Sequence, residues 1–104
     1  MGNKNETNFK NMKHIRNKID KIDKKILDLL SLRFKTTKEI GKIKKEAGLP
    51  MRDKKRESEK IKSLRKLAKQ NNLNPDFIEK LFKTIFNEVV RTNKKIFKSK
   101  KIKL

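Results

Sequence analysis

Residues 15–47 read IRNKIDKIDKKILDLLSLRFKTTKEIGKIKKEA, and this stretch decides the fold. Side chains recur in it at alternating spacings of four and three residues, which is typical of a helix that packs against other helices. The positions on this seam are Ile15, Ile19, Ile22, Ile26, Leu29, Arg33, Thr36, Ile40, Ile43 and Ala47. Arg33 is the exception among them, because a buried arginine keeps its charge and costs several kcal/mol unless an anion accompanies it. The seam therefore predicts an anionic partner beside Arg33, either a protein carboxylate or a bound ligand.

The helix that carries this seam is too long for one small domain. It is predicted to begin between Phe9 and Lys13 and to run to about Glu46, because Gly48 and Pro50 stop a helix. About 35 residues of helix make a rod of about 50 Å, whereas a compact domain of about 100 residues has a radius of gyration of about 13 Å. Either the rod bends or breaks, or two copies of the chain share it. We favour a homodimer.

Two shorter helices are predicted after this rod. The second begins after Asp53 as N-cap and ends around residues 70–72, and the third begins with Asn74 as N-cap and Pro75 at its first position. Their apolar stripes are Ile61, Leu64, Leu67 and Ala68, and then Ile78, Leu81, Phe82, Ile85, Phe86 and Val89. No segment alternates with the period of a strand. The fold class is therefore all-α with three helices per chain, a flexible segment at 1–11, a helical domain at 12–97 and a basic tail at 98–104.

Composition narrows the possible functions. The 104 residues carry a net charge of +20, which is compatible with nucleic-acid binding. The lysines are spread over all segments, so we expect no nucleic-acid partner. The tail run of Lys94, Lys95, Lys98, Lys100, Lys101 and Lys103 reads as a solvated helix end. With no cysteine and a single histidine, His14, the chain lacks the usual ligands of a metal site, and we expect neither metal nor cofactor. The N-terminus has no signal-peptide pattern and no stretch is long enough to span a bilayer, so a cytoplasmic protein is expected.

Polar side chains fall on or beside each apolar stripe. Glu57 lies one turn before the second stripe, and Asn93 lies four residues after the third. Lys44 follows Arg33 by eleven residues, which returns it to nearly the same face of the helix, about 16 Å along the axis. Arg16 lies about 25 Å from Arg33 along the same helix, so it can approach Arg33 only from an antiparallel second copy.

Each of these residues also has a purely structural explanation. Arg33 and Glu57 can form a plain buried ion pair, Lys44 can be a surface lysine, and Asn93 can be a helix-end residue. Together, however, two or three cations, one carboxylate and one amide predict a small, positively charged pocket that suits a small dianion. The set contains no nucleophile and no carboxylate pair. Chemistry in such a pocket would depend on positioning and electrostatics.

Five segments of the chain resemble the all-helical chorismate mutase family, in the order and spacing of that family. They are residues 15–23, 29–33, 40–44, 49–57 and 81–85, and the resemblance covers about residues 12–97. The most distinctive segment is LPMRDKKRE at 49–57. The resemblance implies an intertwined homodimer with two active sites. It also implies an isomerase of the shikimate pathway that converts chorismate to prephenate, toward phenylalanine and tyrosine, by a pericyclic 3,3-rearrangement without metal or cofactor.

The resemblance also assigns roles to residues of this chain. Arg33 would hold one carboxylate of chorismate, and Arg16 of the partner subunit would hold the other. Lys44 and Asn93 would donate hydrogen bonds to the ether oxygen, on which negative charge grows as the C–O bond breaks. Glu57 would accept the substrate hydroxyl.

Two further residues would line the pocket, and two site positions differ from the residues that the family usually has. Asp53 and Arg56 would line the same end of the pocket as the substrate hydroxyl. The family usually has glutamine where this chain has the shorter Asn93, and many relatives have a small hydroxyl residue where this chain has Val89. Both departures weaken polar contacts and imply a slower enzyme.

Three alternatives accompany this interpretation. An isochorismate pyruvate lyase would share the fold and a similar site, although the fuller match at residues 53–57 favours the mutase. A degenerate mutase with another role is compatible with Asn93 and Val89. A basic helical dimer that binds nucleic acid would explain the charge, but it does not explain why Arg33 and Glu57 face inward.

Overall fold

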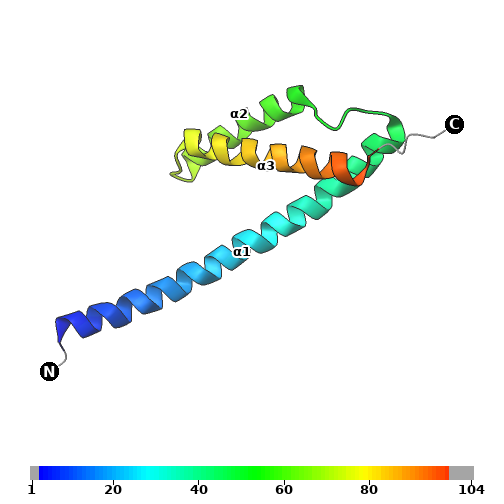
Figure 1. Cartoon of the computed structure of the whole chain (residues 1–104). Coiled ribbons are helices and arrows are strands. Elements are labelled where there is room, and N and C mark those ends of the chain that lie inside the picture. Colours follow the sequence, from blue (N-terminus) through cyan, green and yellow to red (C-terminus); the bar gives the residue numbers. More distant parts are fainter. Residues whose placement is uncertain (1–2, 99–104) are drawn as a thin grey trace. The chain divides into compact units, whose positions relative to one another are not determined.

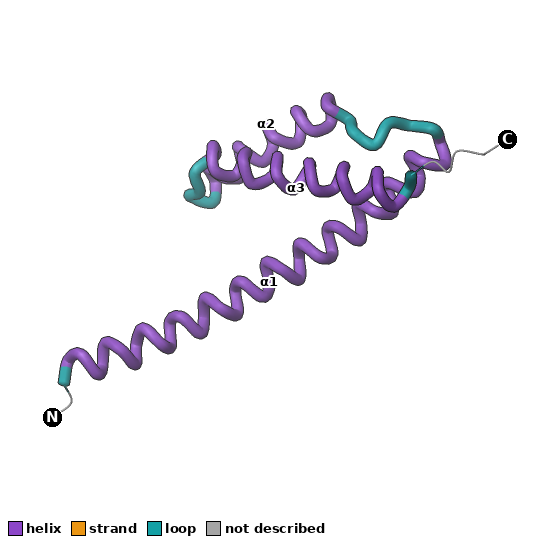
Figure 2. Tube along the Cα trace, viewed as in Figure 1, coloured by secondary structure: helices purple, strands orange, loops and turns teal. Residues whose placement is uncertain are grey.

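The computed structural model describes residues 3–98, and these form three α-helices and no strand. The helices are α1 (Lys4–Ala47), α2 (Lys54–Gln70) and α3 (Pro75–Ile96), as Figures 1 and 2 show. The predicted all-α class with three helices and a very long first helix is confirmed. However, α1 begins at Lys4, before the predicted start between Phe9 and Lys13. Most of the predicted basic tail, residues 99–104 with three of its lysines, lies outside the described residues.

The chain divides into two compact units, residues 1–35 and 36–104. In the first unit the described residues are all α1 apart from Asn3, and none of them is buried. The apolar side chains of its seam are exposed, and these include Ile15 at 54%, Ile22 at 55% and Leu29 at 66%. The second unit contains the last turns of α1, the loop at 48–53, and both shorter helices.

The hydrophobic core lies between α2 and α3, which run side by side (Figure 1). Its buried members are Ile61, Leu64, Ala68, Ile78 and Phe86, and Phe82 packs against them. The rings of Phe82 and Phe86 meet edge to face with centroids 6.2 Å apart. Two predicted stripe residues, Leu67 and Leu81, are instead exposed, because they lie beside the line of residues that faces the other helix. The core is therefore small and belongs to the α2–α3 hairpin.

The predicted end of α1 and the predicted starts of α2 and α3 are confirmed by their capping geometry. The Asp53 carboxylate accepts the Arg56 backbone N–H at 3.0 Å, and the Asn74 side chain accepts the Asp76 backbone N–H at 2.9 Å, directly before Pro75. Gly48 follows α1 with a φ of +67°, which glycine adopts without steric cost. These caps fix both ends of the loop at 48–53.

Within the second unit, α3 approaches the end of α1 closely at Gly41. A Cβ atom on Gly41 would lie 2.7 Å from Nδ2 of Asn93 and 2.9 Å from the ring of Phe97. Gly41 is the one buried residue of α1. Only a residue without a side chain fits this junction as it stands.

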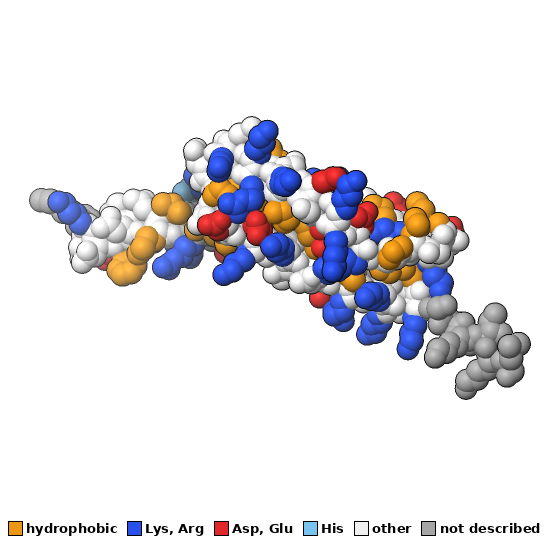
Figure 3. Space-filling view, turned by 90° about the horizontal axis from the view of Figure 1, so that it is seen from above, with side chains coloured by type: hydrophobic (Ala, Val, Ile, Leu, Met, Phe, Trp, Pro, Cys, Tyr) orange, Lys and Arg blue, Asp and Glu red, His pale blue; other side chains and the backbone are white. Residues whose placement is uncertain are grey.

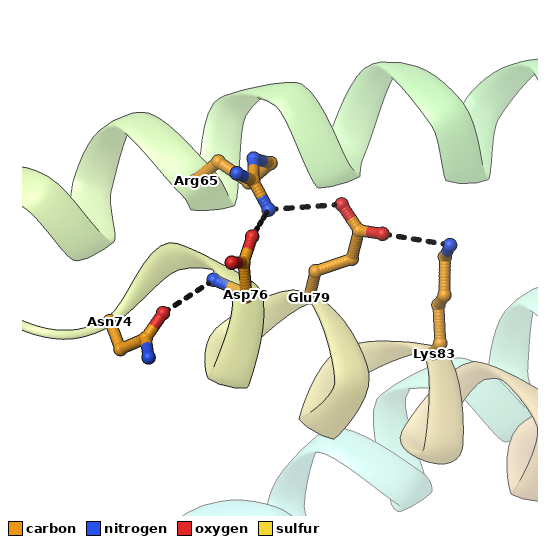
Figure 4. Close-up of polar contacts among 5 residues, drawn as sticks. All are labelled: Arg65, Asn74, Asp76, Glu79 and Lys83. Carbon is orange, nitrogen blue, oxygen red and sulfur yellow. Dashed lines mark hydrogen bonds and ion pairs between the residues drawn. The ribbon is translucent and has the colours of Figure 1, made fainter.

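Ion pairs across the α2–α3 hairpin support the same packing. Arg65 of α2 points toward α3 and donates to Asp76 at 2.9 Å and to Glu79 at 3.3 Å (Figure 4). Lys83 donates to the other oxygen of Glu79 at 2.9 Å. On the face drawn in Figure 3, Lys and Arg side chains are scattered among acidic and apolar ones instead of gathering in one stripe. Among the residues that the structure describes, no helix is both long and apolar enough to cross a membrane.

Candidate functional site

Three consecutive residues of the loop at 48–53 hold it to the helices around it. The carbonyl oxygen of Met51 accepts a hydrogen bond from Nζ of Lys44 on α1 at 3.0 Å. The Arg52 guanidinium reaches both α2 and α3, where it donates to Glu57 and Asn87. Asp53 caps α2. The loop is thus anchored to all three helices, and it carries or adjoins four of the predicted site residues.

A pocket of about 470 Å³ lies at this loop. Its lining residues are Lys44, Leu49, Pro50, Arg52, Asp53 and Lys54. Three cations and one carboxylate give the lining a net positive charge, while Leu49 and Pro50 supply an apolar wall. The volume is in the range of pockets that bind small molecules. The lining therefore suits a small organic anion.

Glu57 forms its ion pair with Arg52. Nη1 of Arg52 donates to Oε1 of Glu57 at 3.2 Å, and the two side chains are 34% and 24% exposed. Nη2 of the same guanidinium donates to Oδ1 of Asn87 on α3 at 2.7 Å. The Glu57 carboxylate thus has a guanidinium partner within its own unit. The predicted position of Glu57 near a core stripe is reflected in its partial burial.

Asn93 is buried at the junction of α3 with α1, where it is 7% exposed. Its Nδ2 donates to the backbone carbonyl of Thr37 at 3.1 Å, and because a carbonyl can only accept, this contact fixes the orientation of the amide. Thr37, Gly41 and Lys44 follow each other at spacings of four and three residues, so they share one face of α1. The structure therefore brings Asn93 to the face of α1 that carries Lys44.

The other predicted site residues are more dispersed. Val89 is half-buried one turn before Asn93 on α3, whereas Asp53 and Arg56 are exposed at the start of α2. Arg16 and Arg33 belong to the first unit, where Arg16 is exposed and Arg33 is half-buried. Burial lowers the pKa of the Arg33 guanidinium from its ordinary value, since desolvation disfavours the charged form. Arg33 is thus less exposed than the apolar seam residues that precede it on α1, such as Leu29 at 66%.

The sequence analysis did not predict a role in the site for two residues of this region, Arg52 and Asn87. Arg52 reads as a turn residue before an N-cap, and Asn87 lies 35 residues away from it with no periodic relation. Only the packing of α3 beside the loop brings the pair together. Within residues 3–98, no three His, Cys, Asp or Glu side chains gather into a possible metal site.

The sequence is similar to a family model and to a curated protein. Residues 15–94 match the family model of chorismate mutase type II, and this range contains every predicted site residue. Over 73 residues, which are 70% of this chain, the sequence is 41% identical to a bifunctional chorismate mutase/prephenate dehydratase from Buchnera aphidicola subsp. Schizaphis graminum (strain Sg). The matched segment spans only 19% of that relative's length.

Proposed function

The chain belongs to the chorismate mutase type II family, and from this premise we propose that it catalyses the pericyclic rearrangement of chorismate to prephenate in the biosynthesis of phenylalanine and tyrosine. The observation that carries the proposal is the convergence of Asn93 and the Met51–Asp53 loop on the face of α1 that presents Lys44. All of these residues lie within the matched range.

The reaction suits a site that has donors but no nucleophile. One C–O bond breaks while one C–C bond forms, and no proton has to move between substrate and protein. The site must select the folded form of chorismate and stabilise the negative charge that grows on the ether oxygen. Charged and hydrogen-bonding groups held in place before the reaction can do both.

Lys44 and Asn93 can both donate to the ether oxygen. The Lys44 ammonium has three N–H donors and uses one of them on Met51, so two are available to a ligand. The Asn93 amide has two N–H donors and uses one on Thr37. Each residue is thus held by a protein contact while it keeps a donor for substrate.

The remaining contacts belong to the two ends of the substrate. Glu57 accepts the chorismate hydroxyl, and Asp53 and Arg56 shape that end of the pocket. Arg33 holds one carboxylate, and Arg16 of the partner subunit holds the other. Val89 cannot donate a hydrogen bond, so this chain lacks the hydroxyl contact that many relatives have at that position.

A second copy of the chain completes the site and covers the exposed seam of α1. The exposed side chains on α1 include Ile15, Ile19, Ile22, Ile26 and Leu29, which form a continuous apolar row on a helix with a single buried residue. Such a row marks an interaction surface. An antiparallel α1 of a second copy would cover it and would bring the partner's Arg16 to Arg33 and Lys44. We therefore include an intertwined homodimer in the proposal.

The test is the loss of chorismate absorbance with purified protein, with prephenate identified as the product. We expect saturable turnover that vanishes in Arg33→Ala and persists in Lys45→Ala, which removes an exposed cation of the same helix. Turnover of isochorismate to salicylate and pyruvate, without turnover of chorismate, would replace the mutase by the lyase. A folded dimer that transforms neither compound would refute both enzymatic functions.

A further inference from the structure

Arg52 connects three parts of the second unit through one side chain. It lies in the loop, its Nη1 contacts Glu57 in the first turn of α2, and its Nη2 contacts Asn87 in the middle of α3. The guanidinium is planar, so its two nitrogens donate in a fixed relation to each other. The position of the Glu57 carboxylate is therefore tied to α3, the helix that also carries Val89 and Asn93.

We propose that Arg52 is a positioning residue that holds Glu57 for the substrate hydroxyl, and that Asn87 in turn holds Arg52. This inference rests on the proposed mutase function, because it assigns a purpose to the geometry of Glu57. Arg52 occupies Oε1 of the carboxylate, and Oε2 is available to accept the hydroxyl. The carboxylate is then fixed before substrate arrives.

An ordinary surface ion pair is the competing explanation for the contact between Arg52 and Glu57. Exposed pairs contribute little, because water screens them and two long side chains must be ordered. The Arg52 pair differs in two respects. The side chains of Arg52 and Glu57 are only 34% and 24% exposed, and the arginine has a second, short contact on another helix. Arg91 and Glu88, an exposed pair within one turn of α3, provide the matched control.

The first experiment compares kcat and KM for chorismate in five variants. We expect Arg52→Ala to lower kcat/KM by about a hundredfold, since a misplaced group of the site costs this much. Asn87→Ala should lower it by about tenfold, the effect of one charge-assisted hydrogen bond, and Asn87→Asp should restore it. Arg52→Lys should behave like the alanine variant, because one ammonium cannot hold both partners. Arg91→Ala should match the wild type.

A double-mutant cycle separates positioning from direct contact with substrate. If Arg52 acts through Glu57, removing Arg52 from a Glu57→Ala protein should change kcat/KM by less than about twofold. A full hundredfold loss in that background would show that Arg52 binds substrate itself and would overturn the inference. Wild-type kinetics in Asn87→Ala would overturn the role of Asn87.

Hydrogen exchange of the substrate-free protein tests the anchoring without any catalysis. The backbone amides of Arg56 and Glu57 bond to Asp53, so they report on the start of α2. We expect both to exchange faster in Arg52→Ala and in Asn87→Ala, and to be unchanged in Arg91→Ala. If the wild type turns over no chorismate, the mutase proposal fails, and the exchange rates alone then decide whether Arg52 anchors the start of α2. Unchanged exchange in both variants would overturn the anchoring as well.

Discussion

The amide nitrogen of Asn93 lies 2.7 Å from the point where a Cβ atom on Gly41 would stand. The Asn93 side chain on α3 thus occupies the space that a side chain at position 41 of α1 would need. Asn93 is held there by its hydrogen bond to Thr37, so it cannot swing aside without losing that bond. This junction sets the distance between a predicted site residue of α3 and the face of α1 that carries Lys44.

Gly41→Ala should lower both stability and activity. Overpacking a tight contact costs about 1–3 kcal/mol, and the better helix propensity of alanine returns about 0.5–1 kcal/mol. We expect a net loss of about 1–2 kcal/mol in the free energy of unfolding, measured by urea denaturation. The rate of chorismate turnover should fall as well, because Asn93 moves. Lys42→Ala, at a neighbouring exposed position, serves as the control, and equal stability of the two variants would contradict the crowding of Asn93.

Asn93→Gln should raise kcat while it lowers stability. Glutamine extends the amide by one methylene and can bring its donor nearer to the ether oxygen, but it loses the present fit between Thr37 and Gly41. A donor of this kind is worth about a hundredfold in rate when well placed, and a partial gain of about tenfold is expected. Single-turnover kinetics and thermal melting measure the two effects separately. A lower kcat would indicate that the limiting defect lies elsewhere, with Val89 as the next position to change.

Lys44→Ala should abolish useful turnover and leave the helical fold intact. Removing one electrostatic contact to the transition state costs on the order of a hundredfold or more in kcat. The variant also loses the hydrogen bond to Met51, so the loop at 48–53 should exchange its amide hydrogens faster. Circular dichroism should show unchanged helix content. A kcat within about threefold of the wild type would remove Lys44 from the mechanism.

Mixing two inactive variants tests whether the partner subunit supplies Arg16. Arg16→Ala and Arg33→Ala should each be inactive alone. If each site combines its own Arg33 with the partner's Arg16, a heterodimer of the variants contains one intact site and one doubly defective site. An equimolar, fully exchanged mixture should then recover about a quarter of the wild-type activity. No recovery, despite heterodimers seen by native mass spectrometry, would mean that both arginines act within one copy.

Acid should weaken the α2–α3 hairpin through Glu79. The hydrogen bond from Lys83 lowers the pKa of Glu79 below its ordinary value of 4.5, with further lowering by Arg65. A lowered pKa in the folded state means that the stabilisation is present above pH 4.5 and is lost as the pH falls through the folded pKa. The melting temperature should therefore drop between pH 6 and pH 3 by less in Glu79→Gln than in the wild type. Equal drops would show that Glu79 makes no contribution to acid sensitivity.

Much of the fold followed from local signals in the sequence. Gly48, Asp53 and Asn74 mark helix ends through chemistry that acts within one turn, so the prediction and the structure agree there. The start of α1 at Lys4 was not anticipated, because residues 4–14 carry few apolar side chains and an exposed helix leaves no strong periodic pattern.

The site was predictable only where a residue stands on an apolar stripe. Lys44, Arg33 and Asn93 interrupt or continue a repeat, and this irregularity identified them. Arg52 and Asn87 do not interrupt an apolar repeat, and their contact depends on how α3 packs beside the loop. The bond from Asn93 to Thr37 likewise joins positions 56 residues apart, which no local pattern encodes.

Because the apolar seam of α1 is exposed, we expect the stability and the activity of this protein to depend on its concentration. Residues 4–35 contain no buried side chain, so packing within the chain gives this part of the helix little support. If a second copy covers the seam, mass action governs both the order of the helix and the number of complete sites. Activity per chain should then fall below a threshold concentration, and the melting temperature should rise with protein concentration.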